Sequence, residues 1–161
     1  MANLDRTNEN PWQLKTAPGT TEYTMHVEEK DGKTVLVCTV GKTVLSYNAR
    51  CVDDLYAMLK EAGNWVDLGG ADEQKEAKAG TVEAWGRDPS NPVGGWYGLK
   101  KGLRGRFGVY VPPLMEVLGL CELEHNAKNN RMRALLRVEE SVTGATPNPW
   151  PVSRRVEVLP E

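Results

Sequence analysis

Histidine and cysteine are scarce in this chain, and those present are far apart. The 161 residues include two histidines and three cysteines: His26, His125, Cys38, Cys51 and Cys121. Metal sites are recognised by short ligand spacings such as Cys-x-x-Cys or His-x-x-x-His, and neither spacing occurs here. An odd number of widely spaced cysteines also excludes a disulfide framework. We therefore expect no metal, no cofactor and three buried, reduced thiols, and leave open a site assembled from distant residues.

Long apolar segments are also missing. No run of residues approaches the roughly 18 that a membrane-spanning helix requires. The first nine residues are polar, with an acid at Asp5, unlike a secretory signal. Hydrophobic residues make up 40% and charged residues 26% of the chain, which is typical of a globular fold. We predict a cytoplasmic protein with no membrane association, built as one domain or two small lobes.

Catalytic motifs are not recognisable. Gly41-Lys42-Thr43 resembles the end of a phosphate-binding loop, but the glycine needed five residues earlier is replaced by Leu36. The triplet lies between two predicted strands, so a hairpin turn explains it better. The acidic pairs at 28–29 and 53–54 fit a strand end and a helix start. A cysteine and a histidine could form a nucleophile and base only if the fold brought them together. The sequence therefore favours a protein that is not an enzyme.

The first half of the chain shows a strand pattern followed by a helix pattern. Apolar and polar residues alternate over 22–28, Asp31-Gly32 is a hairpin signal, and β-branched residues dominate the next two segments, 34–40 and 43–47. We predict a three-stranded antiparallel meander. A helix is expected over about 52–62, with Leu55, Met58 and Leu59 packed on the sheet. Residues 1–20 are predicted to be an irregular arm pinned by Trp12 and Leu14, and residues 21–70 a meander with one helix.

The second half, residues 71–138, is predicted to contain short helices and a hairpin. A lobe boundary is expected near 69–80, and a capped short helix over 81–85. Apolar residues recur at helical spacing over 104–118, but Pro112-Pro113 interrupts them. Either the helix kinks or restarts there, or 106–111 is a strand and the helix starts at Pro112. We predict that 121–125 pairs with 131–135 and that Arg131 and Arg133 face away from the core. The tail, 139–161, has one possible short strand.

Positive charge is concentrated near the C-terminal end of the sequence. Between Trp96 and Val138 there are eight lysines and arginines against three acids, a net charge of +5. The whole chain carries −2, so the remainder carries −7. Such an asymmetric molecule can bind phosphate backbones through its basic end, and nearby aromatic rings can stack on bases. Glycines in the same segment allow close backbone approach. The competing interpretation is a solvated basic face around a structural glycine-rich turn.

These observations define a candidate nucleic-acid interface. Lys100, Lys101, Arg104 and Arg106 would contact phosphate, while Lys128, Arg131 and Arg133 on the hairpin would reach a groove or the backbone.

The order of elements resembles a winged helix-turn-helix over about residues 75–138. The resemblance is carried by the short helix at 81–85, a second helical turn at 97–103, a third helix that closes on Leu118-Gly119-Leu120, and a hairpin with arginines. It implies a helical and hairpin half that contacts DNA or a protein. The segment is also similar to small uncharacterised bacterial proteins, a resemblance that implies no function.

The sequence thus predicts an α+β protein: an antiparallel meander with a helix, followed by a winged-helix-like helical and hairpin half. The expected function is non-catalytic nucleic-acid binding. The alternative is a protein-interaction or small-ligand-binding module that uses a tryptophan-rich surface, since the chain has five Trp and five Tyr against one Phe. In that case the partner is an unidentified protein or small molecule.

Overall fold

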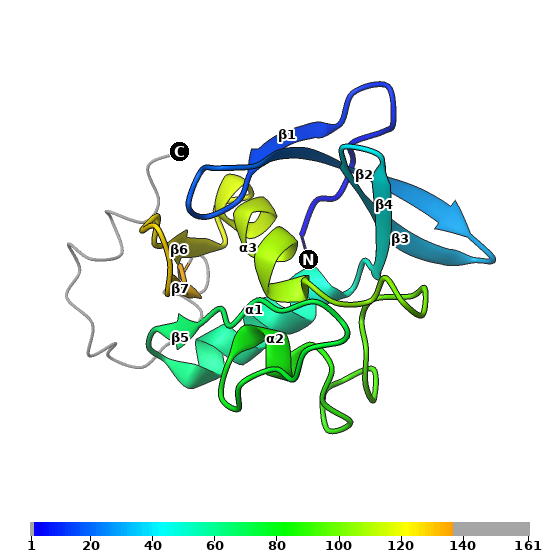
Figure 1. Cartoon of the computed structure of the whole chain (residues 1–161). Coiled ribbons are helices and arrows are strands. Elements are labelled where there is room, and N and C mark those ends of the chain that lie inside the picture. The colour runs from blue at the N-terminus through cyan, green and yellow to red at the C-terminus, as the bar shows by residue number, and fades with distance from the viewer. Residues whose placement is uncertain (1, 137–161) are drawn as a thin grey trace, which may run out of the picture.

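An antiparallel sheet forms the larger layer of residues 2–136, the part of the chain that the computed structural model describes (Figure 1). Its strands, in the spatial order β1-β2-β3-β4, are β1 (Trp12–Lys15), β2 (Glu22–Lys30), β3 (Lys33–Val40) and β4 (Thr43–Asn48). The predicted meander is confirmed as β2, β3 and β4, which pair consecutively. The α+β class is confirmed as well.

Strand β1 lies inside the segment that was predicted to be an irregular arm. It pairs with β2, placing Trp12 opposite Met25 and Leu14 opposite Tyr23. Trp12 and Leu14 are buried, as expected, while the two residues between and after them are exposed. Four residues are too few for their alternation to stand out among the surrounding turn-forming residues. The prediction of irregular structure is therefore wrong for Trp12–Lys15.

Helix α1 (Cys51–Ala62) begins with acidic residues and ends at Gly63, which adopts the left-handed conformation that closes many helices. Leu55 and Leu59 are fully buried, as predicted. The sequence placed this helix on the meander, whereas its most extensive contacts with a strand are with β7 of the smaller sheet. Helix α3 (Phe107–Val117) contacts β1 instead and lies between the two sheets in Figure 1.

Helix α3 runs through Pro112 and Pro113 without ending. Each proline removes one backbone donor, which usually weakens a helix interior. Here the helix is buried on most of its surface, including both prolines, so tertiary packing outweighs the lost hydrogen bonds. Of the two alternatives, the strand over 106–111 is therefore wrong. The short helix is present as α2 (Val82–Trp85), capped by the Thr81 hydroxyl.

The helical turn predicted for 97–103 is absent. Instead, the backbone around Gly98 lies along the edge of β4, with Asn48 N–H donating to the Tyr97 carbonyl and Leu99 N–H donating to the Ser46 carbonyl. An exposed strand edge has unpaired backbone N–H and C=O groups. Here those of β4 form hydrogen bonds with residues 97–99, which therefore lie along this edge. The second helix implied by the winged-helix resemblance is consequently not formed.

The smaller sheet has the order β5-β7-β6, with β5 (Val66–Asp67), β6 (Cys121–Leu123) and β7 (Arg131–Ala134). The predicted antiparallel hairpin is confirmed, with Leu123 opposite Met132 and both buried as expected. Its register differs by one residue from the predicted spans, because Cys121 lies opposite Ala134 and not opposite Leu135. Strand β5 pairs with β7, with Val66 opposite Met132. The strand predicted in the tail lies outside the described residues.

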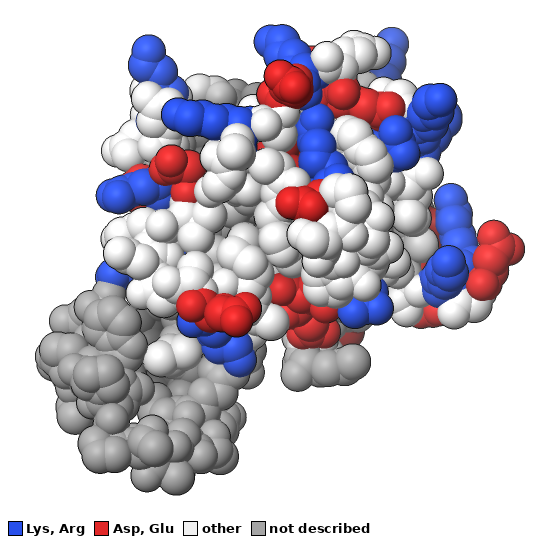
Figure 2. Space-filling model, turned by 90° about the horizontal axis from the view of Figure 1, so that it is seen from below, with Lys and Arg blue, Asp and Glu red and all other residues white. Residues whose placement is uncertain are grey.

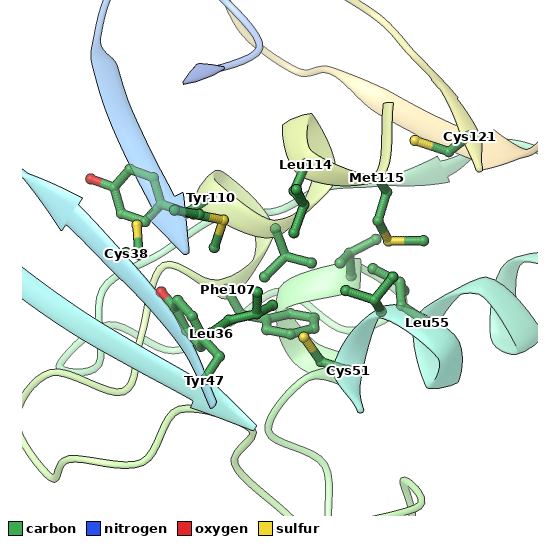
Figure 3. Packing of buried hydrophobic residues seen from close by; sticks show 14 of the residues in the cluster. Leu36, Cys38, Tyr47, Cys51, Leu55, Phe107, Tyr110, Leu114, Met115 and Cys121 are labelled. Carbon is green, nitrogen blue, oxygen red and sulfur yellow. The ribbon is translucent and has the colours of Figure 1, made fainter. Parts of the chain in front are cut away.

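The hydrophobic core draws on both halves of the chain (Figure 3). Tyr47 from β4, Leu55 from α1 and Phe107 from α3 are all essentially inaccessible to solvent. The three cysteines are free and buried, and burial raises the pKa of each thiol far above its ordinary value. Within residues 2–136 no helix combines the length and apolar character needed to cross a bilayer.

Candidate functional site

The basic residues singled out from the sequence fall into two groups at different ends of the molecule. Residues 98–106 run beside β4, whereas the β6–β7 hairpin lies on the other side of α3 (Figure 1). Lysine and arginine side chains on the lower face alternate with acidic ones around an uncharged area (Figure 2). The structure therefore brings Lys100, Lys101, Arg104 and Arg106 together but separates them from Lys128, Arg131 and Arg133.

The hairpin arginines are engaged by neighbouring carboxylates. Arg131 donates to Glu124 with an Nη2 to Oε2 distance of 2.6 Å, and Arg133 donates to Glu122 on the paired strand. The hydrogen bond from Arg131 is the main cause that holds the pKa of Glu124 below its usual value. Both guanidinium groups also stack on Trp65, 5.1 and 4.5 Å from the ring centroid. Lys128 is exposed in the turn. Both arginine charges are thus neutralised locally, as in ordinary cross-strand pairs.

Arg104 is engaged in the same way. It donates to Glu73 over 3.2 Å, and the other oxygen of Glu73 accepts the backbone N–H groups of Gly102 and Arg104. Hydrogen bonding by Arg104 is the main reason that the pKa of Glu73 is lowered. Arg104 and Arg87 both stack on Trp96, each 4.4 Å from the ring centroid. The pairing of Arg104 with Glu73 therefore connects loop 72–74 to loop 100–106 and stabilises the fold.

The glycines of this segment serve the same packing. A Cβ atom on Gly98 would lie 2.4 Å from the Arg104 carbonyl oxygen, and one on Gly105 would lie 2.3 Å from the Glu73 nitrogen. Both distances are shorter than any van der Waals contact. The close backbone approach that glycine permits is thus between parts of this chain.

A buried carboxylate that sequence reasoning missed lies beneath these loops. Glu83 of α2 is 1% exposed and accepts from the N–H groups of Gly108 (2.7 Å) and Ala71 (3.3 Å) and from Arg87 (2.6 Å). It occupies the N-terminal end of α3, where a negative charge is favourable. The available signal was weak, because a Glu in the first turn of a four-residue helix looks like an ordinary surface residue.

A cleft of about 340 Å³ opens between these loops and the β3–β4 turn. Its lining residues are Val40, Thr43, Leu45, Asp72, Glu73, Gln74, Gly102, Leu103, Gly105, Arg106 and Tyr110. The volume is at the lower end of the roughly 300–1,000 Å³ that small-molecule sites span. Aliphatic side chains form part of the wall, and a few polar groups from three segments converge on the same space. This combination is typical of a ligand-binding cleft.

Arg106 is the most unusual residue of the cleft. Its φ of 62° is left-handed, and it directly precedes α3. The other described non-glycine residues with positive φ are Asp31 and Asn129, types that tolerate this conformation far better than arginine. The Arg106 side chain is 50% exposed, and the nearest carboxylate oxygen, on Asp72, is 3.8 Å away, beyond hydrogen-bonding distance. The Arg106 guanidinium group is therefore paired only loosely with Asp72.

Tyr110 lies beside Arg106 at the inner end of the cleft. Its hydroxyl points away from the apolar side chains of the core (Figure 3). Burial raises the pKa of Tyr110, while the charge and hydrogen bonding of Arg106 act in the opposite direction. Tyr110 thus keeps its proton at neutral pH and presents a hydroxyl donor next to a guanidinium group.

Further lysines are exposed next to residues that line the cleft, and together with Arg106 they are called its rim here. Lys42 is exposed in the turn between the cleft residues Val40 and Thr43, and Lys100 and Lys101 are exposed just before Gly102. Since Glu73 is paired with Arg104, Asp72 is the remaining acid that lines the cleft. The rim is consequently cationic. Lys100, Lys101 and Arg106 were in the predicted interface. Lys42 was not, because only the fold brings the β3–β4 turn next to them.

The described tryptophans do not share one surface. Trp12 is buried, and Trp85 stacks on Tyr97. The rings of Trp65 and Trp96 are each covered by arginine guanidinium groups. Trp85 also lines a shallow apolar hollow of about 560 Å³ with Met58, Ala62, Val66 and small residues of 77–84. Among the described residues no group of His, Cys, Asp and Glu is arranged to hold a metal ion.

Comparison with known proteins gives a family and no functional assignment. Neither a curated protein nor a solved structure matches the chain. Residues 4–135, nearly all of the described part, match the model of a family of unknown function, DUF6855. The chain therefore belongs to the DUF6855 family.

Proposed function

We propose that this protein binds a small anionic molecule in the cleft between the β3–β4 turn, loop 72–74 and loop 102–106. The observation that carries the proposal is Arg106. A long side chain is held in a backbone conformation that glycine adopts at far lower cost, and its guanidinium group is half exposed at the cleft. Residues held in unfavourable backbone conformations cluster at active sites and ligand-binding sites.

The charge of the rim supports an anion as the ligand. Lys42, Lys100 and Lys101 are exposed next to residues that line the cleft. Arg106 lines the cleft itself, together with Asp72 at 3.8 Å. A concave surface with one predominant sign of charge concentrates ligands of the opposite sign. The volume of about 340 Å³ supports a small molecule rather than a polymer.

Nucleic-acid binding is less well supported by the same geometry. Arg104, Arg131 and Arg133 are paired with carboxylates and stacked on tryptophan, so their charges are already compensated. A protein that binds a phosphate backbone needs several uncompensated cations along one face, and the two basic groups lie on different sides of α3.

An amide chemical-shift titration tests the proposal. The ¹⁵N-labelled full chain is titrated with phenylacetate, hexanoate and phenyl phosphate, with the neutral analogue benzyl alcohol, and with a mixed-sequence DNA duplex and single strand. We expect at least one of the small anions to move the resonances of residues 102–106 saturably, and benzyl alcohol not to. Arg106→Gln should weaken binding roughly 10- to 100-fold, since a hydrogen bond to a charged group contributes about 1.5–3 kcal/mol.

Lys128→Gln is the matched control, because it removes one positive charge from an exposed position on the other side of α3. It should leave the titration unchanged. If DNA binds with a steep salt dependence and both variants weaken it equally, the protein is a nucleic-acid-binding protein and the cleft proposal is wrong. If no small anion binds, the proposal is wrong as well.

A further inference from the structure

We infer that the anionic group taken by the cleft is a carboxylate, held by Arg106 and Tyr110, and that Asp72 competes with it for Arg106. This inference rests on the proposed function and specifies the chemical class of its ligand: an organic monocarboxylate with an apolar body.

The donors of the cleft match the two oxygens of a carboxylate. A guanidinium group presents planar, parallel N–H donors that pair with both oxygens of a carboxylate. The Arg106 side chain is half exposed, and no hydrogen bond occupies it on the Asp72 side, where the separation is 3.8 Å. The Tyr110 hydroxyl beside it adds one further donor to the same anion. The set suits a planar anion with two oxygens.

A phosphate would be less well accommodated. Phosphate sites commonly use free N–H groups at a helix N-terminus. Here the Gly108 N–H at the start of α3 is already taken by Glu83, and Glu83 also accepts from Ala71. The carboxylate of Asp72 lines the cleft and repels a second negative charge on the ligand. A monoanion meets less repulsion than a dianion.

The apolar walls of the cleft indicate the chemical character of the rest of the ligand. Val40, Leu45 and Leu103 face the cleft with aliphatic side chains. Each buried methylene group of a ligand contributes about 0.8 kcal/mol of transfer free energy, about a fourfold gain in affinity. An aliphatic or aromatic body attached to the carboxylate therefore binds more tightly than acetate.

Asp72 competes with a bound carboxylate for the guanidinium group of Arg106. Its Oδ1 atom accepts from the Gln74 N–H at 3.1 Å, which fixes the side chain, while Oδ2 faces Arg106. A bound carboxylate replaces Asp72 as the partner of the guanidinium group. Because Asn keeps the acceptor for Gln74 and loses the charge, Asp72→Asn should raise the affinity for a carboxylate.

Isothermal titration calorimetry on the full chain tests the inference with phenylacetate, hexanoate, phenyl phosphate and the neutral isostere phenylacetamide. We expect a carboxylate to bind at least about tenfold more tightly than phenyl phosphate, and phenylacetamide not to bind. Arg106→Lys should lose about tenfold in carboxylate affinity although the charge is kept, because the planar fork is lost. Asp72→Asn should gain about three- to tenfold.

The outcomes separate the two proposals. Tighter binding of phenyl phosphate overturns the carboxylate inference and leaves the anion site standing. Failure of every anion to bind removes both. Lys128→Gln again serves as the control. Tyr110→Phe should lower the preference for carboxylate over phosphate, and its chemical denaturation curve tells a lost donor from a damaged core. A weaker rather than tighter carboxylate complex with Asp72→Asn contradicts the competitor role.

Discussion

The loops around the cleft and the β6–β7 hairpin are equally rich in arginine, yet their arginines are used differently. On the hairpin, each guanidinium group meets a carboxylate and stacks on Trp65. At the cleft, Arg104 is engaged in the same manner, with Glu73 and Trp96, but Arg106 next to it is not. Availability of charge therefore depends on the partners of each side chain rather than on the number of arginines.

The two regions are also stabilised by different kinds of hydrogen bonds. The hairpin is a regular sheet element, and its pairs lie at the surface. The loops around the cleft have no regular structure and are organised from beneath by Glu83 and Arg87, which bind the backbone of 71–75 and of α3. A loop cluster without its own ladder of hydrogen bonds needs such an internal anchor.

The largest expected effect therefore comes from Glu83→Ala. Removing Glu83 leaves the buried charge of Arg87 without its carboxylate and the N–H groups of Ala71 and Gly108 without an acceptor, which costs about 3–5 kcal/mol in the free energy of unfolding. Glu124→Ala, at the surface pair of the hairpin, should cause only a small loss. Urea denaturation followed by circular dichroism compares the two. Equal losses would show that the loops do not depend on the buried carboxylate.

A smaller effect of opposite sign is expected at Arg106. Glycine adopts a φ of 62° without the steric cost that a side chain meets, so Arg106→Gly should stabilise the fold by about 0.5–1 kcal/mol after its greater unfolded-state entropy is counted. The same change should abolish anion binding. Asn129→Gly in the hairpin turn, with the same φ, should gain less, because asparagine tolerates this region.

Denaturation midpoints of both variants, with an anion titration of each, provide the measurement. We expect Arg106→Gly to gain stability and lose binding, and Asn129→Gly to gain less stability and keep binding, which would sharpen the contrast between the regions. A destabilised Arg106→Gly variant would mean that the arginine is retained for the fold.

Periodicity and turn signals were sufficient to predict β2, β3, β4, α1 and the hairpin. These elements have residue patterns that repeat over several residues and are closed by Asp31-Gly32, Gly41-Lys42 or Gly63. The helical turn at 97–103 could not be rejected in the same way. Its backbone partners belong to β4, about 50 residues earlier in the chain, and local pattern carries no information about them.

The candidate site was only partly predictable for the same reason. The predicted pairing of 121–125 with 131–135 put Glu122 and Arg133 on neighbouring strands, but the spans gave a register one residue away from the one that places them opposite each other. The pairing of Glu73 with Arg104 joins two irregular loops and could not be predicted from the sequence. The approach of the β3–β4 turn to Arg106 depends on how the sheet packs against α3, which is a property of the whole core.

The smallest expected effect is a pH dependence on the hairpin side. His125 Nε2 lies 2.7 Å from a Glu116 carboxylate oxygen, and its Nδ1 lies 2.8 Å from the Ala17 carbonyl oxygen. The hydrogen bond to Glu116 is the main cause that raises the pKa of His125 above its ordinary value of 6.5. A raised folded-state pKa contributes stability that is complete below the unfolded pKa and is lost as pH rises through the folded value. Because the imidazole is 51% exposed, the effect should be small.

The cleft side should behave differently in this window. The pKa of Glu73 is lowered, so the stability from its pairing is present above its ordinary pKa of 4.5 and is lost only as pH falls below that value. Urea midpoints of the unmodified protein and of His125→Gln, measured between about pH 5.5 and 8, separate the contributions. We expect the midpoint of the unmodified protein to fall with rising pH and that of His125→Gln to fall less. Parallel curves would mean that the pairing of His125 with Glu116 contributes nothing to the pH dependence of stability in this window.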